Sequence, residues 1–93
     1  MRPDQKKILD TIKPILTELL DDAVNKTEGI SRERLRTSLL YEADEIIIRI
    51  SLGTRVMTAR VDPDKLQQET DKRAYLDEAL QLDFMIGVMS INL

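Results

Sequence analysis

The sequence predicts a small α+β protein with its elements in the order α-α-β-β-α-β. Three observations predict this class. An N-terminal stretch repeats its apolar residues with the period of a helix, and a middle stretch alternates with period two around a Gly-Thr pair. The length of 93 residues suits one hydrophobic core. We therefore expect a single domain over residues 1–93, with a small, mainly antiparallel sheet (a β-hairpin plus a C-terminal strand) packed by a long N-terminal helix.

The first expected helix begins near Pro3 and runs to Val24. Its apolar side chains recur at helical spacing over more than four turns: Ile8, Leu9, Ile12, Ile15, Leu16, Leu19, Leu20, Ala23 and Val24. Pro14 removes the backbone hydrogen bond to the carbonyl of Asp10 and crowds it. Because Pro14 falls almost opposite the apolar stripe, a kink there would curve the helix around its core. We expect one bent helix.

A second helix is expected over residues 31–40. Ser31 is a good N-cap residue, and Ile30 and Leu35 are spaced as a hydrophobic staple. Leu35, Leu39 and Leu40 would form its short buried stripe.

Residues 46–61 predict a β-hairpin. Gly53-Thr54 fits a two-residue turn with glycine at the first central position, and this turn sets the register. The pairs on one face are Leu52–Arg55, Ile50–Met57, Ile48–Ala59 and Ile46–Val61, and those on the other are Ser51–Val56, Arg49–Thr58 and Ile47–Arg60. One face is then almost wholly apolar and the other mostly polar, as a half-buried hairpin requires.

A third helix is expected to begin at Asp62-Pro63, with Asp62 as the N-cap and Pro63 in the first turn. Within it, Arg73 is spaced for i,i+4 ion pairs with Glu69 and Asp77. The helix should end before residue 83.

The closing residues 84–93 change to period two and predict a strand. This strand would be apolar on both faces, which is typical of a strand covered on both sides. It would also be an uncharged sheet edge, which proteins normally protect. We expect a second polypeptide, most simply an identical copy, to cover it through Phe84, Met85, Ile86, Val88, Met89, Ile91 and Leu93. The alternative is a three-layer monomer whose own helices cover both faces.

Composition argues against an enzyme. The chain holds no cysteine and no histidine, the usual nucleophile, general base and metal ligand. The remaining candidates are the carboxylates of Glu42, Asp44 and Glu45, the pair Asp62/Asp64 with Lys65, and Asp21/Asp22. However, Asp62 is explained more simply as a helix cap, and no Ca²⁺ loop or glycine-rich phosphate loop is present. We expect no catalytic residues, no metal and no cofactor.

A nucleic-acid-binding module is the alternative function. Arg49 and Arg60 share the polar face of the expected hairpin, with Arg55 at its tip, so a basic β-ribbon is conceivable. The net charge of −3 and the three aromatic residues argue against it. The basic run over residues 31–38 would scatter its arginines around a helix, unlike a recognition helix.

The sequence therefore favours a non-catalytic protein–protein interaction or assembly module, self-associating as a homodimer. A small adaptor, structural or inhibitory protein of the kind encoded by phages and other mobile elements would fit this size. We see no signal peptide, and no apolar run reaches the roughly 20 residues of a membrane helix. We expect a cytoplasmic protein with no membrane partner.

Overall fold

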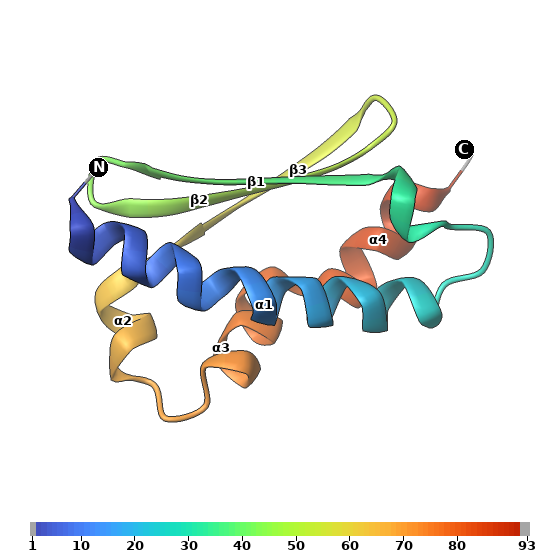
Figure 1. Ribbon diagram of the computed structural model, residues 1–93. Helices are drawn as coiled ribbons and strands as arrows, with labels where there is room; N and C mark the ends of the chain where they lie inside the picture. The colour runs from blue at the N-terminus through green and yellow to red at the C-terminus, as the bar shows by residue number, and fades with distance from the viewer. Residues whose placement is uncertain (1, 92–93) are drawn as a thin grey trace.

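A three-stranded antiparallel sheet lies on one layer of helices in the computed structural model, which describes residues 2–91 (Figure 1). The elements are α1 (Pro3–Asn25), the 3-10 turn η1 (Arg32–Arg34), β1 (Leu35–Glu42), β2 (Glu45–Leu52), β3 (Arg55–Val61), α2 (Pro63–Gln68), α3 (Lys72–Leu80) and α4 (Leu82–Ser90). The strands follow one another in the order β1-β2-β3. The α+β class, with a small antiparallel sheet packed by a long N-terminal helix, is confirmed. Three predicted elements differ in the structure: the second helix, the third helix and the closing strand.

Helix α1 is one continuous helix, as predicted. It contains Pro14 in its interior and buries the expected stripe, including Ile12, Leu16 and Leu20. In Figure 1, α1 runs the length of the sheet beneath it. The helix therefore supplies much of the apolar surface against which the sheet packs.

The hairpin β2–β3 has the predicted register at every pair, from Leu52 opposite Arg55 to Ile46 opposite Val61. Gly53 has a φ of +65°, which glycine adopts without the steric cost of a Cβ atom. Turn chemistry and face alternation both specify this hairpin, so the sequence was sufficient to predict it.

The helix predicted over residues 31–40 is wrong, because this segment forms η1 and then strand β1. Ser31 precedes only one 3-10 turn, and its side chain makes no cap hydrogen bond. From Leu35 onward the chain pairs antiparallel with β2, with Leu35 opposite Leu52 and Leu39 opposite Ile48. Strand β2 is rich in isoleucine. Pairing with β2 stabilises residues 35–42 as a strand more than their short leucine stripe would stabilise them as a helix.

The turn between β1 and β2 explains part of this error. Ala43 and Asp44 both have positive φ, of 48° and 64°, as in a two-residue hairpin turn. In a sequence, such turns are normally recognised by glycine or asparagine at the central positions. Here only Asp44 is of a type that tolerates this conformation.

The predicted third helix is split into α2 and α3. Asp62 caps α2 as expected, since its side chain accepts a hydrogen bond from the backbone N–H of Asp64 at 2.9 Å. Asp71 then caps α3 by accepting from the N–H of Ala74 at 3.0 Å. The second cap restarts the helix, so the chain can change direction between the two.

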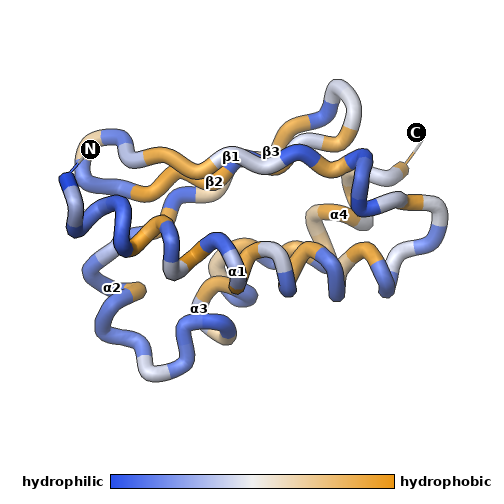
Figure 2. Tube along the Cα trace, in the orientation of Figure 1, coloured by the Kyte–Doolittle hydropathy of each residue, from blue (hydrophilic) through white to orange (hydrophobic). Residues whose placement is uncertain are grey.

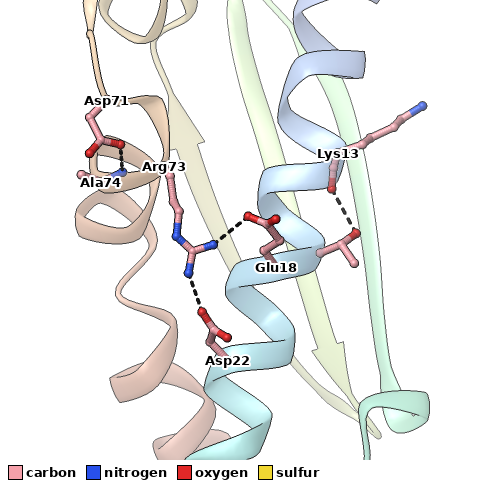
Figure 3. Close-up of polar contacts among 7 residues, drawn as sticks. Lys13, Glu18, Asp22, Asp71, Arg73 and Ala74 are labelled. Atoms are coloured by element: carbon pink, nitrogen blue, oxygen red, sulfur yellow. Dashed lines mark hydrogen bonds and ion pairs between the residues drawn. The ribbon is translucent and has the colours of Figure 1, made fainter.

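The ion pairs predicted for Arg73 within its own helix are also wrong. Arg73 reaches from α3 to α1, where its guanidinium bonds Glu18 at 2.9 Å and also contacts Asp22 (Figure 3). The hydrogen bond to Asp22 is the main reason that the pKa of Arg73 lies above its ordinary value. These exposed contacts align α3 on α1.

The strand predicted over residues 84–93 is wrong within the described residues, because 82–90 form helix α4. Gln81, with a φ of +48°, links α3 directly to α4 without a glycine. Helix α4 packs mainly on α1 and also on β3. The tube in Figure 2 is hydrophobic along much of α4.

The core lies between the helices and one face of the sheet. Buried residues from α1, β1–β3 and α2–α4 form one cluster. Ile48 and its same-face neighbours on β2 belong to this cluster, whereas Ile47 points to the other face and does not. In Figure 1, α1–α4 all lie on the same side of the sheet. The opposite side, which we call the outer face, carries no helix of residues 2–91.

Tyr41 on β1 carries a buried hydroxyl that has no hydrogen-bond partner among residues 2–91. Burial, followed by the nearby carboxylate of Asp4, raises the pKa of Tyr41 above its ordinary value of 10.0. The unfolded chain then releases this proton at a lower pH than the folded chain. Ionisation of Tyr41 therefore leaves the free energy of unfolding unchanged below about pH 10 and lowers it as the pH rises above this value.

We expect Tyr41→Phe to raise the free energy of unfolding at pH 7 by up to about 1 kcal/mol, because it removes an unsatisfied buried group. The variant should also lose less stability between pH 9 and 11 than the parent chain. Urea unfolding followed by circular dichroism measures both effects, with Tyr75→Phe as the matched loss of a phenol. A fall in stability at pH 7 would show that the Tyr41 hydroxyl has a partner.

Candidate interaction surfaces

The acidic residues considered for catalysis come together only in part, since Asp44 and Asp64 border one hollow together with Asp4. Asp44 lies in the β1–β2 turn between Glu42 and Glu45, which end and begin the two strands. Asp62 is occupied as the cap of α2. Within residues 2–91, no three carboxylates are grouped so as to hold a metal ion. The remaining candidate features are two exposed surfaces, one on α4 and one on the outer face of the sheet.

Helix α4 presents two apolar stripes on opposite sides. Leu82, Ile86 and Met89 are buried in the core. Phe84, Val88 and Ile91 point outward, with 66%, 44% and 57% of their surfaces exposed. We call these three residues the α4 stripe. Phe84 and Val88 lie one turn apart on one side of α4, and Ile91, at i+7 from Phe84, is the C-cap residue that follows the helix.

The seven residues predicted at a partner interface therefore do not all face the same way. Phe84, Val88 and Ile91 are exposed, whereas Ile86 and Met89 are buried and Met85 packs against the core. Leu93 lies outside the described residues. The chain's own core thus covers one side of this segment and leaves the other open.

Two further features of α4 affect what can dock there. An added Cβ atom at Gly87 would meet no atom within 4 Å, so the helix surface is open at this point. Asp83 is the one ionisable residue of α4, and its carboxylate pairs with Lys26 of the α1 C-cap at 3.2 Å. The stripe itself is uncharged.

The outer face carries three arginines, one from each strand. Arg36 on β1, Arg49 on β2 and Arg60 on β3 are exposed, and the register places them all on this face. Arg60 pairs with Glu45 at 3.6 Å. Arg36 and Arg49 form no salt bridge with any residue in the described part of the chain. We call this set the arginine diagonal.

The structure removes Arg55 from the predicted basic surface. Arg49 and Arg60 share a face as predicted, but Arg55 points to the helix side. Its guanidinium donates to the backbone carbonyls of Met89 at 3.1 Å and Val88 at 3.4 Å, at the C-terminal end of α4. A cation there stabilises the helix terminus.

Arg36 was missed because residues 31–40 were assigned to a helix. The signal that could have found it is the alternation of β1, in which Leu35, Leu39 and Tyr41 face the core. A period of two places Arg36 on the face of Arg49.

No protein-family model, curated protein or solved structure matches this chain. Among residues 2–91, none of the helices combines the length and the apolar character needed to cross a bilayer. Function has to be inferred from the geometry of the two surfaces.

Proposed function

We propose that this protein is a non-catalytic assembly module that forms a homodimer through helix α4. The observation that carries the proposal is the α4 stripe, an apolar surface that residues 2–91 leave uncovered. A helix that is apolar on all sides is typically buried on all sides. A cytoplasmic location, the compartment expected from the sequence, belongs to the same proposal.

A second copy of the chain is the partner that best fits the stripe. Four large hydrophobic side chains are exposed in the described residues: Val56, Phe84, Val88 and Ile91. Three of them form the stripe, so the matching apolar surface on this protein is the stripe of another copy. Symmetric dimers use the same patch on both subunits, which an uncharged stripe permits without repulsion.

The residues of the stripe match best when the two helices run antiparallel. A twofold axis between Gly87 and Val88 sets Phe84 against the partner's Ile91. It also sets Val88 against the partner's Gly87, where the helix surface is open. A parallel pair would instead oppose Gly87 to Gly87 and bring the two Asp83 carboxylates together. Size and charge therefore both favour the antiparallel arrangement.

The dimer should be reversible. Helix α4 is nine residues long, and we expect so short a helix pair to bury less than the roughly 1,200–2,000 Å² of a stable interface. We expect a dissociation constant on the order of micromolar, corresponding to about 8 kcal/mol of association free energy.

Val88→Glu tests this proposal. The substitution places a carboxylate at the centre of the proposed contact, where burial of an unpaired charge is costly. We expect the variant to sediment as a 10.7 kDa monomer at concentrations where the parent chain is largely dimeric. Because Val88 is exposed, the variant should keep the fold, which circular dichroism verifies.

Val56→Glu is the matched control. Val56 is 61% exposed and lies on the outer face, away from α4, so the same substitution should leave the dimer intact. Equal dissociation of both variants would indicate a nonspecific effect of charge, and unchanged association of Val88→Glu would rule out the stripe as the interface.

A further inference from the structure

The arginine diagonal crosses the sheet in a straight line. Arg49 pairs with Ser38 on β1 and Thr58 on β3, while Arg36 and Arg60 lie two residues beyond these partners in opposite directions along the sheet. Diagonal neighbours in a sheet are about 7–8 Å apart. The Cβ positions of the three arginines are thus regularly spaced along a line that runs diagonally across the strands.

Hydroxyl groups lie between the arginines. Ser51 is paired with Arg36, and Ser38 with Arg49, so arginine and serine alternate on neighbouring strands. Arg36, Ser38, Arg49 and Ser51 line one hollow of about 220 Å³ on this face. Arginine and serine side chains are the usual donors to phosphate oxygens.

Arg49 and Arg60 have a buried neighbour on the outer face, Ile47. Ile47 points to the outer face yet is only 1% exposed, although no helix of residues 2–91 covers it. Its neighbours on that face are Leu40, Glu45, Arg49 and Arg60, and we infer that the stems of the two arginines help to cover it. Arginine stems held in this way lose less conformational entropy on binding.

We propose that the arginine diagonal binds the sugar–phosphate backbone of a single-stranded nucleic acid, with one phosphate at each arginine; at Arg60 the phosphate replaces the exposed contact with Glu45. A peptide added as a strand would run along β1 or β3, whereas the arginines run across the strands. The face carries no aromatic side chain on which bases could stack, so binding would rest on phosphate contacts alone, and these carry no sequence information. This surface and the α4 stripe lie on opposite sides of the sheet, so each can be tested without the other.

The probe is a fluorescein-labelled 20-nucleotide oligothymidylate, and the measurement is its anisotropy against protein concentration from 50 to 200 mM NaCl. Three phosphate contacts on a single strand predict a slope of log K against log salt of about −2, or roughly 20-fold weaker binding across this range. Arg36→Gln, Arg49→Gln and Arg60→Gln should each reduce the slope by about 0.7, and the triple variant should abolish the dependence.

Lys7→Gln on α1 is the matched control, because it removes one exposed positive charge from the helix side of the sheet. Its slope should equal that of the parent chain. Circular dichroism confirms that each variant is folded. Absence of binding at 50 mM NaCl, or an equal loss with Lys7→Gln, would overturn the proposal. So would equal competition by polyglutamate at matched charge, which would assign the surface to acidic peptides instead.

Discussion

Ile48→Ala is expected to lower the free energy of unfolding by about 4 kcal/mol, within the usual range for a large-to-alanine change in a core. Ile48 is fully buried at the centre of β2, where the helices cover the sheet. Its neighbours come from a packed core that can collapse only partially around the cavity. Urea denaturation followed by circular dichroism measures the loss.

Ile47→Ala is the matched control for Ile48→Ala. Ile47 is the next residue and is equally hidden, at 1% exposure, but it lies on the outer face. The side chains above it border solvent and can close over the gap, so we expect a loss of about 2 kcal/mol or less. Equal losses for both variants would show that something also packs firmly against the outer face.

Disulfide trapping should reveal the antiparallel pairing of α4. The chain has no cysteine, so Phe84→Cys and Ile91→Cys each introduce a single thiol. In the proposed dimer, position 84 of one subunit contacts position 91 of the other. An oxidised equimolar mixture should therefore be dominated by the mixed disulfide, resolved by non-reducing electrophoresis and mass spectrometry.

The single variants indicate whether the orientation is correct. Phe84→Cys alone should cross-link slowly, since its two thiols lie at opposite ends of the helix pair. Val56→Cys, on the outer face, should not cross-link faster than expected from collision. Rapid formation of a Phe84→Cys homodimer would contradict the antiparallel arrangement and favour a parallel one.

The sequence predicted best where two independent signals coincided. In β2–β3, a Gly53 turn and a strict face alternation specify the same register, and the structure reproduces it. In α1, the apolar period persists long enough to outweigh Pro14. The β2–β3 hairpin and α1 are both specified mainly by residues close together in the sequence.

Strand β1 was mispredicted because its evidence is non-local. Residues 31–40 carry a plausible cap at Ser31 and leucines compatible with a short helix. The strand forms because β2 offers a pairing edge, through a turn at Ala43-Asp44 that lacks the usual glycine. The same error removed Arg36 from the predicted basic surface.

Helix α4 shows the limit of periodicity for short apolar runs. A run of this length fits a buried strand or a buried helix, and period alone does not separate them. The direct α3–α4 link at Gln81 carries no helix-stop residue that could have indicated the break. The inference that survives the change of element is that Phe84, Val88 and Ile91 are exposed and apolar.

Sedimentation equilibrium of the unaltered chain tests the central claim most directly. Our account predicts that the weight-average mass rises with concentration from 10.7 kDa toward twice that value, and that Val88→Glu eliminates the rise. A constant mass of 10.7 kDa up to millimolar concentration would mean that the outward side of α4 does not bring two copies together.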